Sequence, residues 1–252
     1  MDDLLIDTRD GWTRLTLNRP ATKNALNTAL MACLANVLEG LAADKSCRTV
    51  MICGADGNFA AGADIGEIEL KGSAEGAIDP RKHHWARIRA FPKPLVAAID
   101  GFALGGGFEL ALMADLIVLG ETARIGLPET SLGIMPGAGG SQRLMALAGR
   151  ARATRLVMLG EIIDAATAEA WGIASWRVEG SAIPFAEDLC TKLAKRAPLS
   201  MAAAKRALVI GEEQSLAFAE ERKSFEALLD SADKREGIAA FRAKRKPEFK
   251  GE

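Results

Sequence analysis

The sequence predicts an α/β protein whose last third is mostly helical. Short apolar runs typical of strands alternate with helical patterns through about residue 125, as expected when helices cover a largely parallel sheet. From about residue 151 the pattern changes to successive helical segments, and "ASWRVEG" near residue 176 is the one strand-like stretch among them. The chain has 252 residues, enough for one large domain or for a core with a helical appendage.

Four stretches of the first half have the pattern of strands. "WTRLTLNRP" (12–20) alternates apolar and polar residues and ends at a proline, which is typical of a half-buried strand followed by a turn. "RTVMICG" (48–54), "KPLVAAID" (93–100) and "DLIVLG" (115–120) are continuous apolar runs. Such runs predict strands that are buried on both faces of a sheet.

Between these strands, the segment 27–44 predicts an amphipathic helix. Asn27 is the expected N-cap, and the leucines at 30, 34, 38 and 41 fall on one helical face. By contrast, "LKGSAEGAIDPRKHH" (70–84) is rich in glycine, charged and small residues, and we expect it to be a mobile loop. The charged ending "KRKPEFKGE" (244–252) is expected to be exposed.

The composition excludes several classes of protein. Lys and Arg total 32 and Asp and Glu total 33, so the chain as a whole does not attract nucleic acid or an anionic membrane. The apolar runs are too short to span a bilayer, and the acidic start lacks a signal-peptide pattern. The four cysteines form no CxxC pair and are expected to be buried and reduced. We therefore expect a soluble cytoplasmic protein with neither a nucleic-acid nor a membrane partner.

Few kinds of catalytic chemistry fit the remaining motifs. His83 and His84 are the only histidines and are adjacent, so their rings diverge, and no metal site is predicted. There is no P-loop and no G-x-S-x-G motif, and "PGAGGSQR" (136–143) lacks the third glycine of a dinucleotide-binding loop. Tyrosine is absent. The usable catalytic groups are therefore mainly carboxylates and backbone N–H groups.

Three stretches could bring such groups together: "FAAGADIGEI" (59–68), "DGFALGGGFELALMADLIVLG" (100–120) and "IGLPETSLGIMPGAGG" (125–140). The first two have the pattern of strand-to-helix turns made of small residues, so a ligand can approach the unpaired N–H groups at the helix start. Two such turns side by side would direct two N–H groups at one oxygen, as in an oxyanion hole. Glu109 and Glu129 are the candidate general acid and base.

Each of these features also has a purely structural interpretation. Gly105–Gly107 fits equally well a place where a helix packs tightly on a sheet. Glu109 is favourable in the first turn of a helix whatever its function, and Glu129 after Pro128 fits a helix N-terminus. The residues alone predict two anion-binding turns and two candidate acids, and no specific reaction.

Taken together, the stretches resemble the crotonase superfamily, in particular its enoyl-CoA hydratases. The resemblance covers nearly the whole chain, through "LTLNRPATKNALN", "FAAGADIGEI", "KPLVAAIDGFALGGGFELALMADL", "ARIGLPETSLGIMPGAGGSQRL" and "REGIAAFRAKRKPEFKG". It implies an α/β, crotonase-type spiral of ββα units over residues 1–194. It also implies a C-terminal helical region over 195–252 that builds a homotrimer or a dimer of trimers.

The resemblance also assigns roles to the candidate residues. The backbone N–H groups of Ala63 and Gly106 form the oxyanion hole, Glu109 positions and deprotonates water, and Glu129 protonates the α-carbon. Relatives that only shift a double bond typically lack the first acid, so the implied reaction is hydration of a trans-2-enoyl-CoA to a 3-hydroxyacyl-CoA. The alternatives are an enoyl-CoA isomerase or another crotonase-type lyase and, in a different class, a non-catalytic RNA-binding relative.

The implied substrate is an acyl-CoA thioester, and no separate cofactor is needed because coenzyme A is part of that substrate. The residues that the resemblance places against CoA are Lys23, Ala61, Asp64, Ile65 and Gly105. Basic residues of the C-terminal tail are further candidates for contacts with the CoA phosphates.

The acyl end of the substrate is expected to meet the segment 70–90. The resemblance suggests 2,3-dehydroadipyl-CoA, of phenylacetate or fatty-acid breakdown, as a substrate, and this acyl chain ends in a second carboxylate. Candidate partners for that carboxylate are Arg81, His83, His84, Arg87 and Arg89. The alternative is that these residues form a solvated helix face.

Overall fold

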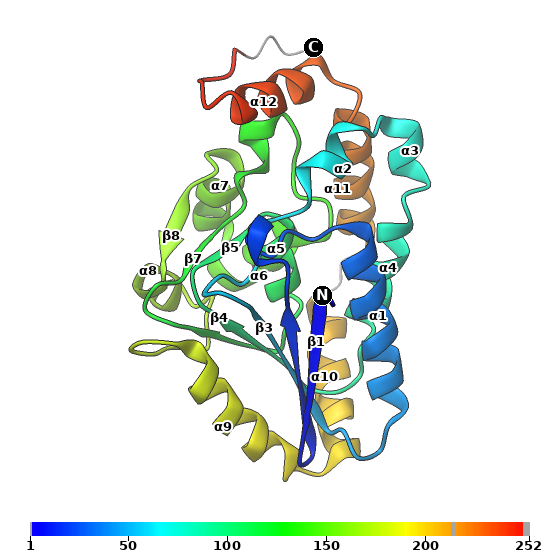
Figure 1. Cartoon of the computed structure of the whole chain (residues 1–252), viewed down its shortest axis with the longest axis vertical. Coiled ribbons are helices and arrows are strands. Elements are labelled where there is room, and N and C mark those ends of the chain that lie inside the picture. The colour runs from blue at the N-terminus through cyan, green and yellow to red at the C-terminus, as the bar shows by residue number, and fades with distance from the viewer. Residues whose placement is uncertain (1, 213–214, 249–252) are drawn as a thin grey trace.

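The structure is a computed structural model that describes residues 2–212 and 215–248 (Figure 1). Six strands form the main sheet in the order β1-β2-β3-β4-β6-β9, in which β1 and β2 are antiparallel and the other neighbours are parallel. These strands are β1 (Leu4–Arg9), β2 (Trp12–Leu17), β3 (Thr49–Gly54), β4 (Leu95–Ile99), β6 (Leu116–Leu119) and β9 (Trp176–Arg177). The strands predicted near residues 12, 48, 93, 115 and 176 are all confirmed, whereas β1 was not foreseen.

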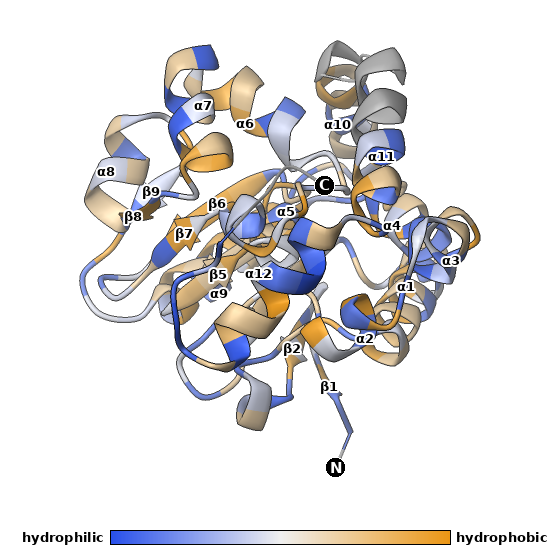
Figure 2. Cartoon of the chain, turned by 90° about the horizontal axis from the view of Figure 1, so that it is seen from above, coloured by the Kyte–Doolittle hydropathy of each residue, from blue (hydrophilic) through white to orange (hydrophobic). Residues whose placement is uncertain are grey.

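Both faces of this sheet are covered, which explains why its central strands are apolar throughout. Along β3, Val50 and Ile52 face a large core shared with α1 (Thr28–Ala43), while Met51 and Cys53 face a smaller core shared with α9 (Ala182–Ala194). The side chain of Asn27 accepts a hydrogen bond from the Leu30 N–H (2.8 Å), so the predicted N-cap of α1 is confirmed. In Figure 2, hydrophobic residues are concentrated on the strands in the middle of the view.

A second, smaller sheet was not predicted, and it carries the segments that form the candidate site. Its strands are β5 (Phe102–Leu104), β7 (Arg124–Gly126) and β8 (Ile162–Asp164), in the order β5-β7-β8. Strands of three residues are too short to show a clear periodicity. α5 follows directly after β5, and the short 3-10 helix η2 follows β7.

The remaining helices are α2 (Ile65–Glu69), α3 (Ser73–Ala77), α4 (Pro80–Arg89), α5 (Gly106–Ala111), α6 (Gly140–Ala148), α7 (Arg150–Met158), α8 (Ala165–Ala170), α10 (Pro198–Glu212), α11 (Ser215–Leu228) and α12 (Ala232–Arg242), with 3-10 helices η1 (Pro20–Thr22) and η2 (Pro128–Leu132). The expectation of a loop over 70–84 is wrong, because α3 and the first half of α4 occupy that segment. Asp79 caps α4 by accepting a hydrogen bond from the Arg81 N–H, and Pro80 occupies its first turn. Both are helix-start signals that the glycine-rich composition obscured.

The C-terminal helices pack on the same chain. Phe225 of α11 and Leu229, the residue after this helix, share a buried cluster with Ile68, Ile134 and Ile238. α11 contacts α3, and α12 contacts α2 and η2, so the helical end of the chain lies beside segments from its first half (Figure 1). The predicted division at residue 194 coincides with the end of α9 and remains a prediction.

Cys47, Cys53 and Cys190 are buried thiols as expected, but Cys33 is exposed, contrary to expectation. In the part of the chain that the structure describes, no helix combines the length and the apolar character needed to cross a bilayer.

Candidate active site

The predicted turn that contains Gly105–Gly107 links β5 to α5. Gly105 has a φ of +50°, a backbone conformation that favours glycine. A Cβ atom at this position would also lie 3.2 Å from Oε1 of Glu129. The turn therefore needs a glycine at 105 for its backbone and for the close approach of Glu129.

The other predicted turn lies directly against this one. Leu26 donates its N–H to the Gly62 carbonyl (2.8 Å) and accepts from the Asp64 N–H (3.0 Å), so the N–H of Ala63 takes no part in this bridge. An ideal Cβ atom built on Gly106 would lie 3.4 Å from the backbone nitrogen of Ala63. Gly106 is the first residue of α5, so its N–H has no acceptor within that helix. The two predicted oxyanion-hole residues are thus neighbours.

Glu109 lies in the first turn of α5 and is buried, with 4% of its surface exposed. Its Oε1 accepts hydrogen bonds from the N–H groups of Ala138 (2.8 Å) and Gly140 (3.0 Å). Burial raises the pKa of Glu109, and these N–H groups offset only part of that effect. At position 140 a Cβ would lie 2.8 Å from Cγ of Glu109, so glycine is required there for the contact. The stretch 136–143, which fits no dinucleotide loop, therefore holds the Glu109 carboxylate in place.

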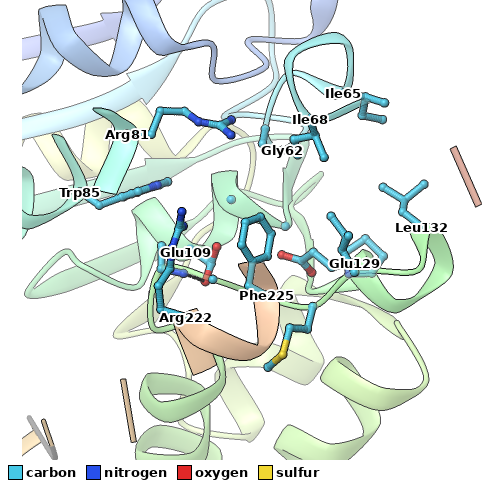
Figure 3. A pocket seen from close by; sticks show the side chains of 18 of the residues that line it. Gly62, Ile65, Ile68, Arg81, Trp85, Glu109, Glu129, Leu132, Arg222 and Phe225 are labelled. Carbon is cyan, nitrogen blue, oxygen red and sulfur yellow. Dashed lines mark hydrogen bonds between the residues drawn. The ribbon is translucent and has the colours of Figure 1, made fainter. Parts of the chain in front are cut away.

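Glu129 reaches the same place from the opposite side. It lies in η2, after Pro128, and is 8% exposed. Its carboxylate lies against Gly105, because a Cβ atom on that glycine would be only 3.2 Å from Oε1 of Glu129. In Figure 3 both carboxylates point into one cleft, and Phe225 lies between them in the view. The two candidate acids, 20 residues apart in sequence, therefore meet at the turn that contains Gly105 and Gly106.

The cleft encloses about 730 Å³, part of it open to solvent. Eight candidate site residues named from the sequence line it: Ala61, Ala63, Ile65, Arg81, Gly105, Gly106, Glu109 and Glu129. Most of the other lining side chains are apolar, and these are Ile68, Trp85, Pro128, Leu132, Ile134, Met135 and Phe225. An apolar cleft with a few convergent polar groups is typical of a small-molecule site.

Two of the predicted CoA-binding residues do not line this cleft. Lys23 lies at its edge, where its carbonyl accepts the Ala61 N–H (2.9 Å) and its ammonium lies 4.7 Å from the centre of the Phe102 ring. The Asp64 carboxylate caps α2 by accepting from the Gly66 N–H and pairs with Arg19 at 3.1 Å. The helix expected after the small residues of this turn begins at Ile65.

Of the basic residues proposed for the acyl end, Arg81 lines the cleft, but its charge is already paired. Its Nη2 lies 2.7 Å from Oδ2 of Asp79, which also binds Lys71 at 2.8 Å. Burial alone would raise the pKa of Asp79, but these hydrogen bonds hold that pKa well below its usual value. Arg87 points elsewhere and pairs with Glu39 (2.5 Å).

Sequence reasoning missed the contribution of α11. Arg222 and Phe225 line the cleft with Trp85 of α4 (Figure 3). Their helical pattern predicted a helix, but no local signal shows that this helix folds back onto the turn at Gly106. The last residues of the tail, 249–252, lie outside the described residues, so the expected contact of that part with CoA stays a prediction.

Comparison with known proteins identifies the family. The family model described as "Enoyl-CoA hydratase/isomerase" matches residues 7–252. The chain belongs to this family. A 2,3-dehydroadipyl-CoA hydratase of Escherichia coli is 46% identical over the full length of both chains. A probable enoyl-CoA hydratase of Rhizobium meliloti is 40% identical over 99% of this chain and 98% of its own.

Solved structures of the family have the same architecture. An enoyl-CoA hydratase from Mycobacterium avium subsp. paratuberculosis superposes with a TM-score of 0.87 at 31% identity, and the match covers 99% of each chain. The mixed α/β crotonase fold with C-terminal helices, expected from the sequence, is therefore confirmed.

Proposed function

We propose that this member of the enoyl-CoA hydratase/isomerase family adds water to a trans-2-enoyl-CoA and forms a 3-hydroxyacyl-CoA. The observation that carries the proposal is the meeting of two buried carboxylates with two adjacent backbone N–H groups in one apolar cleft. The substrate is an acyl-CoA thioester, and no separate cofactor takes part.

The N–H groups of Ala63 and Gly106 stabilise the charge that develops during the reaction. As water attacks the β-carbon, the α-carbon gains enolate character and negative charge accumulates on the thioester oxygen. Backbone donors that are already in place stabilise this charge without reorganising. Small residues at 61–63 and 105–107 leave room for the thioester to approach them.

Glu109 and Glu129 move the two protons. Glu109 takes a proton from water as the hydroxyl bonds to the β-carbon, and Glu129 gives a proton to the α-carbon. One water is thereby added across the double bond, and proton exchange with solvent restores both carboxyl groups. Burial, which raises the pKa of Glu109, makes its carboxylate a stronger base than an exposed glutamate.

Isomerisation is the competing reaction within the family, since a single acid at the second position can move a proton along the acyl chain. The presence of Glu109, fixed by two backbone N–H groups, favours hydration, because this carboxylate is positioned to activate water.

Activity with crotonyl-CoA tests the proposal. We expect the purified protein to remove the absorbance of the conjugated enoyl thioester and to form a product heavier by one water. The amount of 3-hydroxyacyl-CoA, measured by mass spectrometry, should match the enoyl-CoA consumed. A protein that only moves the double bond of 2- and 3-enoyl-CoA substrates would contradict the proposal.

For the acyl group we propose 2,3-dehydroadipyl-CoA, and with it a place in phenylacetate breakdown. The support is the relative named for this substrate, at 46% identity over the full length. For the CoA moiety we propose the backbone of Ala61 and Ile65 along the cleft and the ammonium of Lys23 at its edge, with Asp64 acting by holding the start of α2.

We also propose that the chain forms a homotrimer or a dimer of trimers. The support is a set of exposed apolar side chains around α6 and α7, namely Met145, Leu147, Met158, Leu159 and Ile162, which are 40–76% exposed. Apolar groups gathered on a surface in this way are typical of an interface between copies. Light scattering after gel filtration should give three or six times the 26.7 kDa chain mass, and a monomeric mass would contradict the proposal.

A further inference from the structure

Beyond Glu109, the cleft continues into a recess whose charged side chains are all basic. This recess has a volume of about 600 Å³, part of it open to solvent, and shares Trp85, Gly137, Ala138 and Arg222 with the catalytic cleft. Its remaining lining residues are Lys82, Ala86, Arg89 and Gly139. Figure 3 shows Trp85 and Arg222 on the Glu109 side of the cleft, and Ile65 and Leu132 on the Glu129 side. The part of the cleft nearest Glu109 therefore opens into a recess lined by positively charged side chains.

The Arg222 guanidinium is held rigidly at the junction of the two cavities. Its Nε donates to Oε1 of Glu226 (2.8 Å), its Nη2 donates to the Gly76 carbonyl (3.1 Å), and it lies 4.9 Å from the centre of the Phe225 ring. Only 17% of the side chain is exposed. Among the residues whose side chains the structure describes, none accepts a hydrogen bond from its Nη1, so this nitrogen can donate to a ligand.

Among the side chains that the structure describes, the group formed by Lys82, Arg222 and Glu226 carries one more positive than negative charge. Lys82 binds the same Glu226 oxygen at 2.7 Å, so two cations share one carboxylate. Burial alone would raise the pKa of Glu226, but hydrogen bonds from Lys82 and Arg222 lower it. This carboxylate therefore stays ionised. The cluster of Lys82, Arg222 and Glu226 keeps a net charge of +1. Arg81, in contrast, is engaged by the buried Asp79.

We propose that Arg222 binds a carboxylate at the far end of the acyl chain and so determines a preference for dicarboxylic enoyl-CoA substrates. This inference rests on the proposed function. A guanidinium in a partly buried site forms strong, directed hydrogen bonds with a carboxylate. A methyl-ended chain of the same length would leave the Nη1 of Arg222 without an acceptor, and unpaired polar groups are the main source of discrimination between such substrates.

The test compares two six-carbon substrates, 2,3-dehydroadipyl-CoA and trans-2-hexenoyl-CoA, which differ only at the far end. We expect the wild-type kcat/KM to be higher for the dicarboxylic substrate. Arg222→Gln should lower kcat/KM for 2,3-dehydroadipyl-CoA by roughly 10–100-fold, as for a lost hydrogen bond to a charged group, and leave trans-2-hexenoyl-CoA within about threefold. Arg222→Lys should retain part of the preference, because it keeps the charge and loses the fork.

Lys223→Gln is the matched control, since it removes one cation from the exposed face of the same helix and should change neither value. The monomethyl ester of 2,3-dehydroadipyl-CoA should behave like the hexenoyl substrate in the wild type. Equal losses with both substrates in Arg222→Gln would show a purely structural role and overturn the inference, as would a wild type without preference. A wild type that hydrates neither of these substrates nor crotonyl-CoA would instead overturn the proposed function, whereas activity with crotonyl-CoA alone would overturn the inference.

Discussion

Replacing Glu109 by glutamine is expected to lower kcat by roughly 10²–10⁴-fold, the range typical of lost general acid–base catalysis. The amide has the size of the carboxyl group, and its oxygen can still accept from the N–H groups of Ala138 and Gly140. The change therefore removes the base while the loop at 136–140 keeps its contact. Rates with crotonyl-CoA at saturating substrate measure the effect, and near-full activity would remove Glu109 from the mechanism.

The pH profile identifies the role of Glu109 more specifically. Because burial raises the pKa of Glu109, the base is lost by protonation at a higher pH than for an exposed glutamate. In the wild type, kcat/KM should thus fall as the pH decreases through a value above about 4.3, the usual pKa of glutamate. In Glu109→Gln the residual kcat/KM should not show this fall at low pH. The same decrease of kcat/KM in both proteins would show that a group other than Glu109 causes it.

Stability provides the control for Glu109→Gln. An acid whose pKa is raised in the folded state binds its proton more tightly there than in the unfolded chain. Its ionisation therefore lowers the free energy of unfolding as the pH rises through the folded-state pKa. Glutamine does not ionise and so avoids this loss of stability. Urea denaturation at neutral pH should therefore give an unchanged or higher free energy of unfolding. A large loss of stability would instead attribute the lost activity to misfolding.

Glu129→Gln should lower kcat over the same range for a different reason, since Glu129 delivers the proton to the α-carbon. The readout specific to this step is deuterium at the α-carbon of the product formed in D₂O. We expect its rate of appearance to fall in parallel with hydration. Rapid exchange of the α-proton in a variant that no longer hydrates would show that another group protonates this carbon.

The sequence predicted those parts of the fold and site in which neighbouring residues determine the local structure. The apolar runs at 48–54, 93–100 and 115–120 are buried strands because helices cover both faces of the sheet. The turns at 61–65 and 105–107 could be found because small residues between a strand and a helix leave few other conformations. That both turns lie together, with Glu109 and Glu129 beside them, was expected from the resemblance alone.

What could not be predicted depends on contacts between distant segments. Nothing near residue 222 shows that α11 folds back onto the cleft or that Arg222 meets Lys82 and Glu226, because a helical pattern is the same whatever the helix packs against. The loop expected at 70–84 is helical because α3 packs on α11, while Asp79 caps α4 and binds Arg81 and Lys71. The contact of α3 with α11 is long-range, whereas the Asp79 contacts are local signals that the glycine-rich composition obscured.

The oxyanion hole can be tested by a pair of substitutions that differ in one hydrogen-bond donor. Gly106→Pro removes the N–H of Gly106, and the first position of a helix is where proline is best tolerated. Gly106→Ala adds a Cβ at the same place, 3.4 Å from the Ala63 nitrogen, and keeps the N–H. The proline variant should therefore have a kcat roughly 10²–10³-fold below that of the alanine variant, the usual cost of one oxyanion donor.

Spectroscopy separates this loss from a change in fold. A bound enoyl thioester polarised by two N–H groups should absorb at longer wavelength than the free thioester, and the proline variant should show a smaller shift than the alanine variant. Equal unfolding transitions in urea would establish that both variants are folded. If the two variants had equal rates and equal shifts, the N–H of Gly106 would not stabilise the thioester oxygen. The glycine at 106 would then serve the close packing of α5 against Ala63, the structural interpretation of "LGGGFE" that the residues alone allow.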